Sequence, residues 1–291
     1  MKLRHHHAVW LMVLVALLWS TAGVVTRHLE YARTFEVTFW RALFASISLL
    51  LILPYFQGRS VFTKIRHAGT AVWISGVCWA VMFTAYMVAF TLTTVGNVLV
   101  TLSLGPLLTA VVARVLIGYR VPMRTWLAIV VAGAGMAYMF AAQVGSASLA
   151  GSLVALSIPL AAAVNWTISQ HSHDQGHDLD LVPAVLLGAL LSTAATCALA
   201  YPFQASAHDV TLLGLLGVFQ LAIPCVLCMV CARVLHAPEI SLLQLLEVIF
   251  GILLAWWGAN EAPGAPVLLG GGLVIGALVA NEWLGWKQKP A

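Results

Sequence analysis

Long apolar runs alternate with short polar gaps along the whole chain. A helix needs roughly 20 apolar residues to cross the hydrocarbon core of a bilayer. Runs such as Ala8–Thr26 and Leu127–Ala142 lack the alternation of apolar and polar residues that marks a transmembrane β-strand. The pattern therefore predicts an all-α integral membrane protein. Its ten transmembrane helices are expected over residues 8–26, 36–56, 70–91, 95–117, 124–142, 149–170, 181–201, 209–232, 238–258 and 264–284.

The overall composition excludes a soluble protein. Hydrophobic residues make up 62% of the 291 positions and charged residues only 8%, whereas about a quarter of the residues in soluble domains are charged. The first apolar run is followed by many others, so we interpret it as a retained helix rather than a cleaved signal peptide.

The positive charges predict an orientation. Cytoplasmic loops carry an excess of Lys and Arg, and eleven of the fourteen basic residues fall on the side of the amino terminus. Arg27 and Arg33 lie on the other side, and Arg41 lies inside the second helix. Both termini are therefore expected in the cytoplasm of a bacterial cell with the protein in its inner membrane. The eleven are Lys2, Arg4, Arg59, Lys64, Arg66, Arg114, Arg120, Arg124, Arg233, Lys287 and Lys289.

Two halves of the chain share a pattern at an offset of about 142 residues. Asn97–Gly118 aligns with Glu239–Gly258, and each block is followed by a glycine-containing apolar helix. We therefore predict two repeats, residues 1–145 and 146–291. Five helices per repeat is an odd number, so the repeats would insert with opposite orientation, as in many transporters.

Short motifs give the chain a resemblance to a known family. They are Leu18–Thr21, Phe39–Leu43, Leu104–Ala110, Leu245–Phe250 and Leu269–Gly276. Together they are similar to the EamA-type family of the drug/metabolite transporter (DMT) superfamily.

The sequence also departs from that family. Val248 stands where the family usually has a proline after glutamate, and Gly118-Tyr119 stands where it often has Gly-Glu. The resemblance implies export of metabolites by alternating access. In size and aromatic content the chain further resembles the aromatic amino-acid exporter group (YddG-like).

Arg41 and Glu247 are the ionisable residues that stand out inside the predicted helices. Such residues are costly in the membrane and are candidates for function. Glu247 could carry a proton or bind a substrate amine, and Arg41 could be its charge partner or bind a carboxylate. Both could instead be structural, with Arg41 snorkelling or bonding carbonyls and Glu247 bonding a neighbouring helix.

Aromatic and neutral polar residues are the other candidates for a substrate cavity. Trp79, Phe83 and Tyr86 share one face of a helix, which either packs in the core or forms a cavity wall. Amides and hydroxyls suit both ends of an amino acid, although bonds between helices compete for them. The full set of candidates is Trp19, Trp79, Phe83, Tyr86, Asn97, Thr101, Asn165, Trp166, Gln244 and Glu247.

Prolines inside predicted helices are candidate hinges, because each removes one backbone hydrogen bond. The candidates are Gly105, Pro106, Pro159 and Pro224. A static kink that serves packing is the alternative.

Two clusters could bind metal but have simpler explanations. Cys225, Cys228 and Cys231 are spaced as small residues on one helix wall. The loop from His171 to Asp178 is expected to be solvated. We predict no metal site and no cofactor.

These features favour a transporter. A single internal carboxylate and no internal histidine argue against an intramembrane enzyme, and no ring of charges or carbonyls indicates a channel. Without an ATP-binding motif, a secondary exporter of small molecules is expected, with aromatic or apolar amino acids as the best candidates. Export of drugs or other metabolites is the alternative. The expected partners are the substrate and the lipid bilayer, with no nucleic acid, and we expect a monomer.

Overall fold

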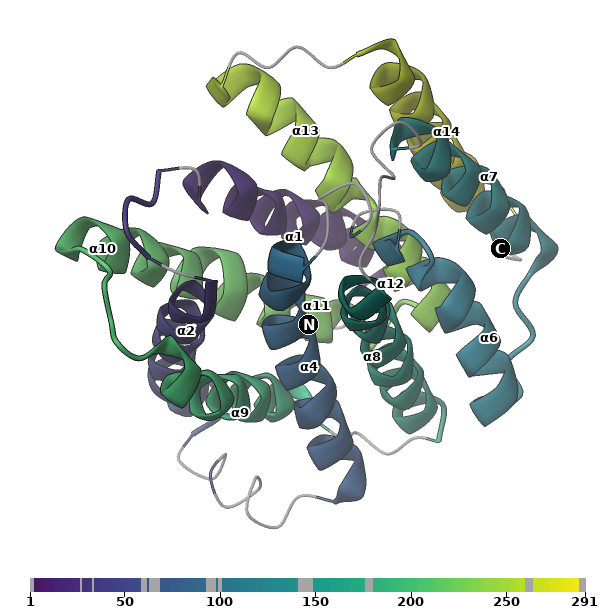
Figure 1. The fold of residues 1–291 in the computed structure, drawn as a ribbon. Helices are drawn as coiled ribbons and strands as arrows, with labels where there is room; N and C mark the ends of the chain where they lie inside the picture. Colours follow the sequence, from purple (N-terminus) through teal and green to yellow (C-terminus); the bar gives the residue numbers. More distant parts are fainter. Residues whose placement is uncertain are drawn as a thin grey trace.

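The computed structural model describes residues 3–26, 28–32, 34–58, 62, 69–92, 98, 101–140, 149–175, 180–259 and 264–287. This part of the chain is built of helices (Figure 1). The first half contains α1 (His5–Thr26), α2 (Thr34–Gln57), α4 (Thr70–Leu92), α6 (Gly105–Ile117) and α7 (Met123–Phe140).

The second half begins with α8 (Leu149–Asp174) and α9 (Val182–Ala200). A continuous span follows, made of α10 (Ala207–Leu215), the π-helix η2 (Leu216–Ala222) and α11 (Ile223–Cys231). A further span is divided into α12 (Ala237–Gln244) and α13 (Leu246–Ala259), and α14 (Ala265–Lys287) is last.

The all-α membrane fold predicted from the apolar runs is confirmed. Within the described residues, eight helical segments are long and apolar enough to cross a bilayer, and α6 and most of α7 are shorter apolar helices. These correspond in order to the ten predicted spans.

Two predicted helices are interrupted. The helix expected over 95–117 is not continuous, because a turn at Ser103–Leu104 precedes α6, which begins at Gly105. Pro106 therefore lies in the first turn of a helix, where its missing N–H costs nothing. The helix expected over 238–258 is divided at Leu245. In contrast, α8 continues four residues past its expected end at 170, to Asp174.

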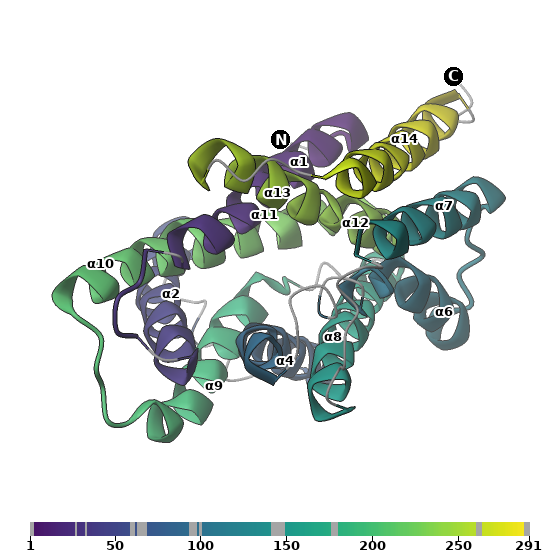
Figure 2. The same ribbon diagram turned by 45° about the horizontal axis from the view of Figure 1, so that its top comes forward.

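Helices from the two halves pack against each other throughout. The largest contacts join α7 to α14, α4 to both α8 and α9, and α2 to α9. In Figure 2, α7 and α14 run side by side at one end of the molecule. A buried apolar cluster fills the side on which α1 begins, and it includes Met12, Val15, Val185, Met229 and Ile240.

Glycines allow some of these helices to approach closely. A Cβ on Gly188 of α9 would overlap the Cβ of Trp79 in α4, and one on Gly76 would lie 2.9 Å from Leu187 Cβ. Gly217 of η2 lies against α2, where an added Cβ would be 2.7 Å from the Arg41 carbonyl oxygen. Membrane helices use small residues in this way because close backbone approach increases van der Waals contact.

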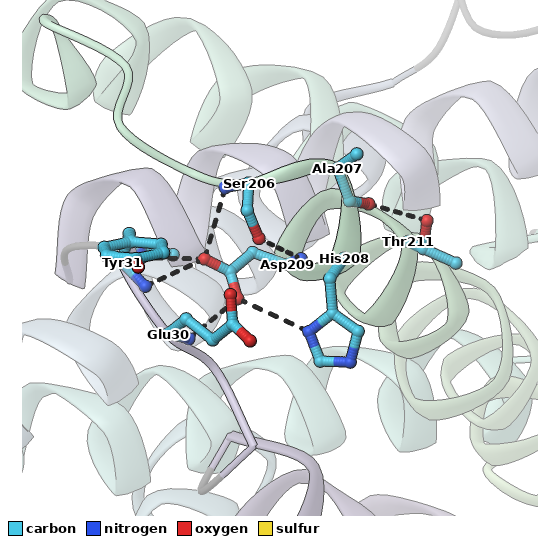
Figure 3. A network of polar contacts seen from close by, with 8 residues as sticks. Glu30, Tyr31, Ser206, Ala207, His208, Asp209 and Thr211 are labelled. Atoms are coloured by element: carbon cyan, nitrogen blue, oxygen red, sulfur yellow. Dashed lines mark hydrogen bonds and ion pairs between the residues drawn. The ribbon is translucent and has the colours of Figure 1, made fainter.

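Asp209 joins two loops near the carboxyl end of α1 (Figure 3). Its buried carboxylate accepts backbone N–H bonds from Glu30, Tyr31 and Ala32 at 2.8, 3.0 and 3.1 Å. It also accepts from the Ser206 N–H at 3.3 Å, while the Ser206 hydroxyl accepts from the Asp209 N–H, so the pair forms a capping box at the start of α10.

Glu36 makes the reciprocal connection from the first half of the chain. Its carboxylate is buried and accepts backbone N–H bonds from Gln204 at 3.0 Å and Ala205 at 2.8 Å. It also accepts the indole N–H of Trp40 at 3.3 Å. We call Glu36 and Asp209 the loop clasp, because each binds the backbone of a loop from the other half.

We expect Asp209→Asn to destabilise the protein by about 3 kcal/mol, because an amide cannot accept all of the bonds that the carboxylate accepts. The loss would appear as a lower melting temperature of the purified protein in detergent. Glu30→Gln is the matched control: it removes the same charge nearby, but Glu30 takes part through its backbone only. Equal melting temperatures for the two variants would contradict this role.

We expect Gly188→Ala to cost about 1–3 kcal/mol, because the added methyl group forces α9 away from α4. Gly133→Ala is the control, since nothing lies within 4 Å of a Cβ at that position in α7. In the same melting assay this control should be neutral or slightly stabilising. A Gly188→Ala protein as stable as the control would show that the crossing can relax.

Candidate functional site

A cavity of about 520 Å³ lies among α1, α2, α4, α6, α8, η2, α11, α12 and α13. Pockets that bind small molecules commonly have volumes of about 300–1,000 Å³. The lining begins near the middle of α1 at Trp19 and continues to Thr26, at the carboxyl end of that helix. The buried cluster that contains Met12 and Val15 continues from Trp19 toward the beginning of α1. The cavity is therefore closed on the side where α1 begins.

Aromatic rings lie at the deep end of the cavity. Trp79 and Phe83 line it, with their ring centroids 5.4 Å apart. Trp166 is fully buried and meets Trp79 edge to face at 5.6 Å. The Trp166 indole N–H donates to Gln244 Oε1 at 3.1 Å, which connects α8 to the end of α12. We call Trp79, Phe83 and Trp166 the aromatic floor. It offers apolar surface, and its bond to Gln244 holds that amide in place.

Arg41 and Glu247 both line the cavity, although they come from helices in different halves of the chain. Arg41 of α2 is only 2% exposed and interacts electrostatically with Glu247 of α13. The Tyr86 side chain of α4 is a hydrogen-bonding neighbour of Glu247. The cavity thus holds one guanidinium and one carboxyl group in apolar surroundings, where electrostatic interactions are stronger than in water.

The interruption at Leu245 determines where Glu247 lies. Because α13 begins at Leu246, Glu247 occupies its first turn. The first turn of a helix carries partial positive charge and favours a carboxylate. The interruption occurs without the proline that the family pattern has, since Val248 stands there.

Several buried polar atoms have no hydrogen-bond partner among the described residues. Three of them belong to residues that line the cavity, namely Arg41 Nη1, Trp79 Nε1 and Gln220 Oε1. Buried polar atoms are nearly always bonded, so each exception requires an explanation. Two donors and one acceptor are therefore open to whatever occupies the cavity.

The residues predicted from the sequence are only partly brought together. Asn97 lies outside the described residues. Thr101, Asn165, Trp166, Pro106 and Pro224 are described but do not line the cavity. The lining includes Trp19, Trp79, Phe83, Tyr86, Gln244, Glu247, Arg41, Gly105 and Pro159.

Asn165 has a different environment from the one expected. It is fully buried, and its Oδ1 accepts the Ser75 hydroxyl at 2.6 Å, while its Nδ2 lies 3.9 Å from Met229 Sδ. It therefore joins α8 to α4 and α11 within the core. The sequence placed Asn165 inside the membrane but carried no information about which neighbours it faces.

Gln220 lines the cavity and was not among the residues predicted from the sequence. The available signal was an isolated amide in the apolar run 209–232. A search for charged side chains passes over such a residue. Ser20 and Cys225 of the lining were also not predicted as cavity residues.

Polar contacts also connect the loops on the closed side. Arg233 Nη2 lies 2.6 Å from Asp180 Oδ1, and Arg124 donates to the Asn281 carbonyl at 2.9 Å. This pair places Asp180, directly before α9, beside Arg233, which follows α11. Nearby, burial raises the pKa of Tyr119 to about 12, so this phenol stays neutral.

Residues 6–141, a little under half of the chain, match the EamA-like transporter family. The family is one of transporters rather than enzymes. No protein of curated function matches the sequence.

A comparison of folds covers nearly the whole chain. A solved crystal structure aligns with a TM-score of 0.80 over 96% of this chain and 98% of the other, at 18% sequence identity. At that identity the likeness shows a shared fold. The chain is an all-helical membrane protein, and its described residues surround an internal cavity.

Proposed function

We propose that this EamA-like protein is a secondary transporter that exports amino acids with aromatic or apolar side chains across a bacterial inner membrane. The observation that carries the proposal is the cavity itself, in which Arg41 and Glu247 are combined with an aromatic floor. The family match supports transport, and the cavity chemistry supports the substrate class.

The charges of the cavity complement a zwitterion. The Arg41 guanidinium suits a carboxylate, and the Glu247 carboxylate suits an ammonium group. Because the two protein charges cancel, an amino acid of zero net charge enters without leaving an unpaired charge in the low-dielectric interior. Trp79 and Phe83 then provide apolar surface for the side chain. A sugar phosphate would need more cations than Arg41 provides.

Helix contacts support the proposed pair of inverted five-helix repeats. In the proposed repeats, α1 corresponds to α8, α4 to the span of η2 and α11, and α6 to the span of α12 and α13. The contact of α4 with α8 then corresponds to the contact of α1 with η2 and α11. The contact of α6 with α8 corresponds to the contact of α1 with α13. The close approaches correspond as well. Gly76 lies against α9 as Gly217 lies against α2, and these two glycines are about 142 residues apart, the offset noted in the sequence.

The same repeat arrangement suggests how the cavity would change its access. In the transporter mechanism, one group of helices rocks against another around a site near the midplane. The cavity reaches the end of α1 and is closed beyond the aromatic floor, which corresponds to access from one side. Gly105 of α6 and Pro159 of α8 line the cavity and are the proposed pivots of this motion. Pro224, in the first turn of α11, follows the π-helix η2.

Counterflow in proteoliposomes tests the function. Vesicles loaded with unlabelled L-phenylalanine should accumulate labelled L-phenylalanine transiently and with saturation. Flux that never saturates, with no counterflow, would indicate a channel. Counterflow of quaternary ammonium compounds but of no amino acid would instead assign a multidrug exporter.

We expect Glu247→Gln to reduce L-phenylalanine counterflow at least tenfold, because the ammonium group loses its ionic partner in an apolar cavity. Counterflow should be measured from pH 5.5 to 8.5. Glu30→Gln, which changes an exposed carboxylate outside the cavity, is the control. Unchanged flux with an unchanged pH profile in Glu247→Gln would exclude Glu247 from both substrate binding and proton coupling.

A further inference from the structure

The π-helix η2 interrupts an otherwise α-helical span beside the cavity. At its end the Ile223 N–H bonds to the Val218 carbonyl, five residues earlier. Single π-helical turns within α-helices are rare and occur often at functional sites.

The π-turn brings Gln220 to the cavity. Gln220 and Cys225 both line it, although they are five residues apart. In a regular α-helix, an offset of five residues corresponds to a rotation of about 140°, which would place the two side chains on different faces. In a π-helical turn the hydrogen bonds join residues five apart, which brings two such side chains back toward the same face.

Gln220 is anchored at one end of its amide and open at the other. Its Nε2 donates to the Trp19 carbonyl at 3.3 Å, whereas its Oε1 is buried with no hydrogen-bond partner among the described residues. The side chain is only 5% exposed. A buried acceptor without a donor is costly, so an occupant of the cavity that supplies an N–H would be favoured.

Arg41 supplies the complementary group from the neighbouring helix. Gly217 of η2 lies directly against the backbone of α2 at Arg41. Arg41 Nη1 is also buried and lacks a hydrogen-bond partner in the described part of the chain. An unsatisfied acceptor and an unsatisfied cationic donor therefore come from two touching helices and line one cavity.

We propose that Gln220 and Arg41 form the subsite for the polar head of the substrate. Gln220 Oε1 accepts a hydrogen bond from the substrate ammonium group, and Arg41 Nη1 donates one to the carboxylate. Gln220 is thus a specificity-determining residue, and the π-turn is the element that positions it. This inference rests on the proposed amino-acid substrate and adds where its head binds.

Three probes distinguish recognition of the substrate ammonium group from recognition of its carboxylate. L-Phenylalanine carries both groups, phenethylamine lacks the carboxylate, and 3-phenylpropionate lacks the ammonium group. Equilibrium binding of each to the purified protein in detergent can be measured by calorimetry, independently of transport.

Gln220→Leu should weaken binding of L-phenylalanine and phenethylamine about tenfold, which corresponds to about 1.4 kcal/mol, and leave 3-phenylpropionate unchanged. Arg41→Gln should instead weaken binding of L-phenylalanine and 3-phenylpropionate and leave binding of phenethylamine unchanged. Gln204→Leu makes the same substitution on an exposed loop and should leave all three affinities at the wild-type value.

Gln220→Glu separates recognition from a purely structural role. It keeps an acceptor for the ammonium group and adds a carboxylate that competes for Arg41. Phenethylamine binding should therefore be retained or strengthened, while 3-phenylpropionate binding falls. A structural role alone would lower all three affinities together in both Gln220 variants, and that result would overturn the proposal.

The outcomes also distinguish this inference from the proposed function. Probe-specific losses in a protein that shows no amino-acid counterflow would support the subsite and reject the transport proposal. Counterflow of L-phenylalanine that Gln220→Leu does not weaken would keep the transport proposal and overturn the subsite. Binding of none of the three probes by the wild-type protein would overturn the assigned head group.

Discussion

Polar groups inside this molecule must find their hydrogen-bond partners within the protein, because hydrocarbon offers none. That constraint explains the helices and most of the contacts between them. Asn165 bonds to Ser75, Thr125 bonds to Asn281 at 3.0 Å, and Thr84 lies 2.9 Å from Ser192. Each of these pairs joins two different helices. The interior polar residues therefore determine which helices are neighbours.

The same constraint gives meaning to the polar atoms that are left over. A folded chain in lipid has little to gain from an unsatisfied donor at Arg41 or an unsatisfied acceptor at Gln220. Both line the cavity of about 520 Å³. A ligand that supplies the complementary groups would restore the missing bonds. The cavity is thus an incomplete hydrogen-bond network rather than empty space.

The spans were predictable from the sequence because lipid requires long apolar runs whatever their neighbours are. Arg41 and Glu247 were predictable for a related reason: charges are so rare inside the membrane that each one stands out. The interruption before Gly105 had a local signal, because Gly105 and Pro106 were candidate hinges, whereas nothing local distinguishes Leu245 from continuous helix. Gln220 was missed because it is neutral, and Asn165 was grouped with the cavity because spacing alone does not identify the facing helix.

Glycine positions were visible in the sequence, but their roles depended on tertiary contacts. Gly188 and Gly133 both lie in apolar helices, yet one lies against Trp79 and the other has open space beside it. Only the packing of α9 on α4 distinguishes them. Sequence patterns therefore located the membrane segments and some of the chemistry, while the arrangement of the site depended on contacts between distant helices.

The loop clasp restricts how the helix ends that it joins can move. Asp209 and Glu36 bind loops from opposite halves of the chain, so the ends of α1, α2, α9 and α10 share one set of constraints. A displacement of either loop must break several charge-assisted bonds at once, and these helix ends therefore move together. The cavity-lining helices α4, α8, α12 and α13 take no part in the clasp, so a change of cavity width that leaves the clasp intact must involve these helices.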